Sequence, residues 1–143
     1  MTKKEKILFS YIANIIVDEK PNDVFIKTKQ DISKLLKRIE KFNINTLSIS
    51  PNIENISTEN YDLFIIFDDI KVNEADIGTI KNLISQKIVI FTNFENDEKT
   101  DKTMIKLGLQ TELRDKTNKL KCFSYNLKTY NKREEIGIIL KAG

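Results

Sequence analysis

The fold of this chain is decided by the stretch Tyr61-Asp62-Leu63-Phe64-Ile65-Ile66-Phe67-Asp68-Asp69-Ile70. Five consecutive apolar residues followed by two carboxylates predict a strand that is buried on both faces and opens into a loop. A strand of this kind is typical of a parallel sheet covered by helices on each side. Ligands of open α/β sheets bind beyond the carboxyl ends of the strands. Asp68 and Asp69 are therefore candidate site residues.

Helical and strand patterns alternate along the rest of the chain. Apolar residues that recur on one helix face predict the helices, at 3–18, 29–41, 101–107, 134–141 and from about residue 73 to 84. Short apolar or alternating runs predict the strands, at 23–27, 46–50, 61–67, 87–92, 109–114 and 120–127. The segment 52–60 is expected to be a loop with a helical turn, 93–100 is expected to be a loop, and 115–119 is the expected turn of a hairpin.

This order predicts an α/β fold, and more finely a three-layer α/β/α sandwich with a mostly parallel sheet and an antiparallel C-terminal hairpin. The chain has 143 residues, which is enough for one domain with its own core. We expect a single domain over residues 1–143.

The charge of the chain is only a weak indication of a nucleic-acid surface, and solvated faces of mixed charge are strongly favoured. Its 24 Lys and Arg against 21 Asp and Glu give a net charge of +3, but the cations are interspersed with anions, whereas a nucleic-acid footprint is one-sided. No segment approaches the roughly 20 apolar residues that a membrane span needs. The single cysteine, Cys122, excludes an internal disulfide and favours the cytoplasm.

Several kinds of chemistry lack their residues. The chain has no His, so triads and the common zinc sites are excluded and no metal is expected. Cys122 is predicted to be a buried, inert thiol. The turn after the first strand, Lys27-Thr28-Lys29-Gln30-Asp31, has no glycine, which argues against a bound nucleotide cofactor.

The remaining candidates lie at strand ends. The acidic pair at 68–69 could hold Mg²⁺ or a ligand amine, although capping of the next loop is the favoured interpretation. Other parallel strands end in polar residues that could line the same crevice: Lys27, Thr28, Ser50 and Asn93. A C-terminal group could stack a planar ligand or simply pack against the sheet: Phe123, Tyr125, Tyr130 and Arg133.

The segments 61–70 and 87–93, the helix ending Leu107-Gly108-Leu109 and the closing hairpin are similar to the second half of class I S-adenosylmethionine-dependent methyltransferases, which have a Rossmann-like fold. The segment 123–133 also resembles the C-terminal signature of a small uncharacterised proteobacterial family with that fold, Tyr-x-Tyr-Asp-Leu-x-x-Tyr-Asn-x-x-Arg. Tyr125, Leu127, Tyr130 and Asn131 match it, and Arg133 lies one position before its Arg. The resemblance runs from about residue 60 to the end, and it implies the strand order 2-1-3-4-6-5 with the last strand antiparallel and inserted.

The chain departs from both patterns. Phe123 and Asn126 replace a Tyr and an Asp, and Glu134-Glu135 stands where the small family has Trp-Asn. The cofactor glycines are missing, and the second strand ends in Ser50-Pro51 instead of an acidic residue. We therefore expect a non-catalytic binding or interaction module of the bacterial cytoplasm, without a cofactor, whose partner is a protein or a small molecule. The alternatives are a small S-adenosylmethionine-dependent methyltransferase and a nucleic-acid-associated accessory protein.

Overall fold

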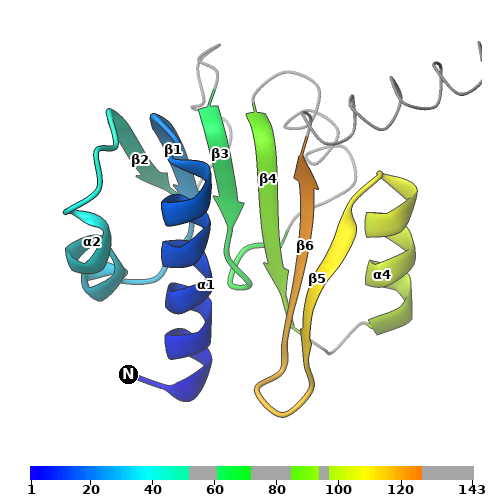
Figure 1. Ribbon diagram of the computed structural model, residues 1–143. Coiled ribbons are helices and arrows are strands. Elements are labelled where there is room, and N and C mark those ends of the chain that lie inside the picture. Colours follow the sequence, from blue (N-terminus) through cyan, green and yellow to red (C-terminus); the bar gives the residue numbers. More distant parts are fainter. Residues whose placement is uncertain (52–60, 72–84, 94–96, 127–143) are drawn as a thin grey trace, which may run out of the picture.

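The computed structural model describes residues 1–51, 61–71, 85–93 and 97–126 (Figure 1). In chain order the elements are α1 (Lys3–Glu19), β1 (Asp23–Lys27), α2 (Ser33–Ile39), β2 (Thr46–Ser50), β3 (Tyr61–Ile66), β4 (Ser85–Thr92), α4 (Asp97–Lys106), β5 (Gln110–Asp115) and β6 (Leu120–Asn126). The predicted helices at 73–84 and 134–141 and the predicted loop at 52–60 lie outside the described residues. No helix within the described ranges is long and apolar enough to span a membrane.

The strands form one mixed sheet in the order β2-β1-β3-β4-β6-β5. The pairs β1–β2, β1–β3 and β3–β4 are parallel, whereas β6 runs antiparallel to both β4 and β5. The predicted order, with the last strand inserted antiparallel between two others, is confirmed. In Figure 1 this inserted strand lies between β4 and β5.

β3 is buried on both faces, as its apolar run predicts. Leu63, Ile65 and Phe67 point into one hydrophobic cluster, which also contains residues of α1 and α2. Phe64 and Ile66 point into a second cluster, which contains Met104 of α4. Side chains alternate between the faces of a strand, so the two clusters lie on opposite faces of the sheet. The complete three-layer sandwich stays a prediction.

Two helices begin elsewhere than the apolar pattern predicts. The helix expected from residue 29 starts at Ser33, because Gln30 N donates to Thr28 Oγ1 (3.0 Å) and Ser33 N donates to Asp31 Oδ1 (3.0 Å). Side-chain acceptors of this kind hold a turn in competition with a helix. α4 starts at Asp97 instead of residue 101.

The C-terminal hairpin follows its predicted turn chemistry. Gly108 ends the helical segment at a φ of 87°, a left-handed conformation that favours glycine. At the tip, Asn118 donates from its backbone to Asp115 Oδ1 (3.0 Å) and from its amide to Asp115 Oδ2 (2.8 Å). These bonds fix the turn between β5 and β6.

Candidate functional site

The carboxyl ends of three parallel strands meet at one edge of the sheet. Lys27, the last residue of β1, is in register with Ser50 of β2 and with Ile66 of β3. Beyond these pairs, Thr28 N donates to Ser50 O (3.2 Å) and Phe67 N donates to Lys27 O (3.0 Å). The structure therefore brings together the predicted site residues that end these strands. Lys27 and Thr28 are buried there, at 6% and 3% exposure.

Asp69 closes the turn that follows β1. Its Oδ1 accepts a hydrogen bond from the Thr28 hydroxyl (3.0 Å), and its Oδ2 accepts one from Lys29 N (2.6 Å). The Thr28 oxygen in turn accepts from Gln30 N (3.0 Å). One carboxylate of the loop after β3 thus holds the loop after β1 through both of its oxygens.

Among the described residues, only one of the two carboxylate oxygens of Asp68 accepts a hydrogen bond. Its Oδ2 accepts from Lys4 Nζ of α1, 64 positions earlier in the chain. The Asp68 side chain is 9% exposed, and the Lys4 side chain is 34% exposed. Within the described residues, Asp68 Oδ1 is buried without a hydrogen-bond partner. A buried carboxylate oxygen in this state costs free energy unless a donor reaches it.

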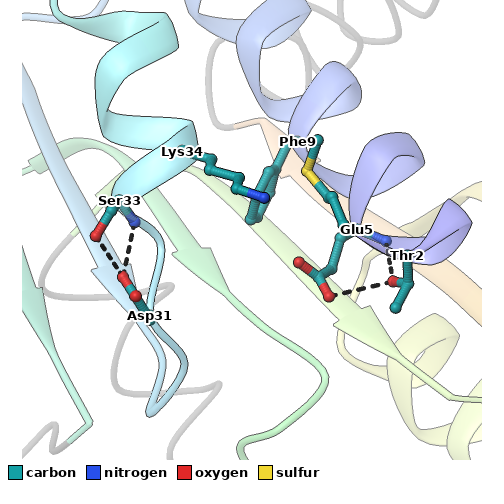
Figure 2. Close-up of a pocket in the computed structure, with 7 residues that line it drawn as sticks. Thr2, Glu5, Phe9, Asp31, Ser33 and Lys34 are labelled. Carbon is teal, nitrogen blue, oxygen red and sulfur yellow. Dashed lines mark hydrogen bonds between the residues drawn. The ribbon is translucent and has the colours of Figure 1, made fainter.

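Two adjoining cavities lie between the start of α1 and the turn before α2. The first has a volume of about 520 Å³ and is drawn in Figure 2; it is lined by Met1, Thr2, Glu5, Phe9, Asp31, Ser33 and Lys34. In that view Lys34 extends from α2 toward Phe9 of α1. The second has a volume of about 440 Å³ and is lined by Thr2, Lys4, Glu5, Leu8, Phe9, Gln30, Asp31 and Asp68. The cavities thus adjoin the strand ends on the side of α1.

Local capping contacts fix the rim of these cavities. Glu5 N donates to Thr2 Oγ1 (3.1 Å) and the Thr2 hydroxyl donates to Glu5 Oε1 (3.2 Å), which together cap α1 (Figure 2). On the opposite side, the hydroxyl and the backbone N–H of Ser33 both donate to Asp31 Oδ1, and these bonds lower the pKa of Asp31. The Asp31 carboxylate is therefore ionised at neutral pH.

Sequence reasoning did not find the cavity residues contributed by α1. The apolar pattern of residues 3–18 predicted a helix, and it gave no site role to Lys4 or Glu5. A Thr-x-x-Glu pattern at residues 2–5 is a capping signal that locates the start of the helix. No pattern in the sequence predicts that the start of α1 lies beside the end of β3.

The other predicted site residues do not join this group. Asn93 is exposed after the end of β4. Phe123 and Tyr125 of β6 are buried in the second cluster, at 0% and 5% exposure, which favours the packing interpretation over stacking on a ligand. Tyr130, Asn131 and Arg133 lie outside the described residues.

The Cys122 thiol is buried, as predicted, at 0% exposure on β6. Desolvation raises its pKa to about 12, so the nucleophilic thiolate is not populated at neutral pH. Burial also raises the pKa of the neighbouring Tyr11 hydroxyl. Among the described residues, no group of three or more acidic or thiol side chains is arranged to hold a metal ion.

Comparisons with known proteins give a fold and no sequence relative. No family model matches the sequence, and no curated protein matches it either. Among solved structures, the crystal structure of the methyltransferase domain of bacterial-CtHen1-CN aligns with a TM-score of 0.56 at 11% identity, over 87% of this chain and 100% of that chain. The fold is methyltransferase-like. Thermoplasma acidophilum 1320 aligns with a TM-score of 0.45 at 9% identity, over 82% of each chain.

Proposed function

We propose that this chain is a non-catalytic binding or interaction module on a methyltransferase-like fold. The observation that carries the proposal is the carboxylate of Asp69 in the turn after β1, bonded to the Thr28 hydroxyl and to Lys29 N. We also expect that the protein is located in the bacterial cytoplasm and that its fold is a three-layer α/β/α sandwich.

The turn after the first strand is where an α/β domain of this kind offers backbone N–H groups to an anionic cofactor. Here the N–H of Lys29 donates to Asp69 at 2.6 Å. A cofactor carboxylate or phosphate at the same place would have to displace the internal carboxylate and would be repelled by its charge. The buried Thr28 side chain further blocks the close approach that a glycine permits.

A small S-adenosylmethionine-dependent methyltransferase is the second candidate. It is favoured by the likeness to a methyltransferase domain that is covered along its whole length. Its active site would lie near Asp68, Asp69 and Asn93, at the carboxyl ends of β3 and β4. This candidate requires the Asp69 contacts to open when the cofactor enters.

Calorimetric titration of the purified chain with S-adenosylmethionine and S-adenosylhomocysteine separates the two candidates. For a binding module we expect no saturable heat at millimolar ligand. A methyltransferase would give saturable binding that Asp69→Asn changes, while the exposed Asp18→Asn, which alters net charge equally at the far end of α1, leaves it unchanged. Saturable binding of either compound at this edge would overturn the proposal.

A further inference from the structure

Asp68 combines features that point to a ligand. Its side chain is 91% buried, since its exposure is 9%, and it lines the 440 Å³ cavity. Its Oδ2 is paired with Lys4, and its Oδ1 has no hydrogen-bond partner within the described part of the chain. Lys4 therefore balances the negative charge of Asp68, whereas Asp68 Oδ1 still lacks a hydrogen-bond donor among the described residues.

The cavity around Asp68 favours a cation. It is lined by three carboxylates, those of Glu5, Asp31 and Asp68, against the single ammonium group of Lys4. The Ser33 hydrogen bonds stabilise the charged form of Asp31 and lower its pKa. Lys34 lines only the adjoining cavity. An anionic ligand would therefore meet an excess of like charge.

Leu8 and Phe9, both less than 5% exposed, give the same cavity an apolar wall. Such a wall suits the alkyl part of a side chain whose charged end reaches a carboxylate. The cation at Asp68 is now the primary amine of Lys4, a compact charge that bonds one oxygen. A planar guanidinium carries two parallel N–H groups and can bond both oxygens of a carboxylate.

We propose that Asp68 is the anchor of a recognition site for a guanidinium group, such as an arginine side chain of a partner, which enters the cavity as Lys4 turns out to solvent. The Lys4 side chain is already 34% exposed, so it can leave with little loss of packing. The incoming group would bond both oxygens of Asp68, including Oδ1. This inference rests on the proposed function, because it names the chemical group that the binding module takes.

The test titrates the isotopically labelled chain with a blocked Gly-Arg-Gly peptide and with methylguanidinium, using the Gly-Lys-Gly peptide and methylammonium as controls. Amide chemical shifts are followed by NMR. We expect saturable shifts confined to the residues around Lys4, Gln30 and Asp68, at least about tenfold tighter for the guanidinium probes than for the ammonium probes. A tighter peptide points to a protein partner, and equal affinity of the two guanidinium probes points to a small guanidino compound.

Two variants make the assignment specific. Asp68→Asn should weaken guanidinium binding by at least about tenfold. Lys4→Arg should weaken it similarly while keeping the chain folded, because the internal guanidinium can bond both oxygens itself. Asp18→Asn, which changes the net charge as Asp68→Asn does, should bind like the wild type.

The inference is overturned if the wild type shows no saturable localised shifts, or if Lys4→Arg and Asp68→Asn bind the probes as the wild type does. Either result leaves the proposed function standing, because that proposal is decided by the titration with S-adenosylmethionine. The circular dichroism spectrum of each variant establishes that it is folded before binding is compared.

Discussion

Cys122 gives the stability of the protein a dependence on alkaline pH. Its pKa rises from 9.0 to about 12 on folding, because burial on β6 disfavours the thiolate. Between these values the unfolded chain releases the thiol proton and the folded chain retains it. The free energy of unfolding should therefore fall as pH rises from about 9 toward 12, by up to about 1.4 kcal/mol per pH unit for this one proton.

Urea unfolding of the wild type and of Cys122→Ala at about pH 8 and about pH 10 measures this effect. The other ionisable groups are present in both proteins, so the difference between the two pH dependences reports the thiol together with its effect on the pKa of the neighbouring Tyr11. The wild type should lose more stability than Cys122→Ala over this range. Equal losses would show that the thiol has a similar pKa in the folded and the unfolded chain.

Sequence reasoning at the residue scale succeeded where a property depends on burial alone. The apolar context of Cys122 was enough to predict an inert thiol. Both carboxylates after β3 were placed at the ligand edge of the sheet, and capping of the following loop was the favoured role. Asp69 instead bonds the loop after β1, at Thr28 and Lys29. The partner of Asp68 was not predictable, because Lys4 is 64 residues away and apolar periodicity does not specify which polar groups meet.

At the scale of elements, one carboxylate joins α4 to the C-terminal hairpin. Asp101 Oδ1 accepts from Lys121 Nζ of β6 (2.9 Å), and its Oδ2 accepts from Arg114 Nη1 of β5 (2.7 Å). The Lys121 side chain is fully buried, and desolvation lowers its pKa. Replacing Asp101 by Asn should lower the free energy of unfolding by about 1–3 kcal/mol, because it removes a carboxylate that contacts the buried Lys121 ammonium group.

Thermal or urea unfolding of two further variants controls this prediction. Arg114 is half exposed, so Arg114→Met should cost less than about 1 kcal/mol. Lys121→Met removes the buried charge together with its need for a partner, and should also cost little. If Asp101→Asn were no more costly than Arg114→Met, the pair with Lys121 would contribute no more than a surface ion pair.

The sequence predicts whether a segment is a helix or a strand more reliably than it predicts the first and last residues of that segment. The bounds of β1 and β2 match the prediction, since a short apolar run defines β1, and hydrophobic alternation ended by Pro51 defines β2. The start of α2 does not, because the Thr28 and Asp31 side chains bond the backbone of the turn and hold it out of the helix. Apolar periodicity detects the face a helix buries, whereas its first residue depends on polar contacts that the periodicity does not contain.

At the scale of the whole molecule, the strand order was predictable and the packing of polar groups between elements was not. The resemblance to methyltransferases implies one strand order, and the sheet has that order. The cavities beside Asp68 arise where α1, the turn after β1 and the end of β3 converge. Such a junction depends on side-chain geometry between segments distant in sequence, which no single pattern in the chain encodes.

The strand order of the sheet also predicts which backbone amides exchange with solvent most slowly. β3 lies between β1 and β4, and four of its six residues have no exposed surface, so its amides should exchange with solvent only through global unfolding. β2 and β5 are the edge strands, and both carry exposed residues. Their amides should exchange through local opening, which costs less free energy than global unfolding.

Hydrogen exchange followed by NMR after transfer into D₂O measures this difference. Each 1.4 kcal/mol between local and global opening is a tenfold difference in exchange rate, so the edge strands should lose their signals at least about tenfold sooner than β3. Amides of β2 that persist as long as those of β3 would mean that the sheet opens as one cooperative unit. β6 gives a second test of the same prediction. It lies between β4 and β5, and six of its seven residues are buried. Its amides should therefore exchange as slowly as those of β3, although β6 comes late in the chain.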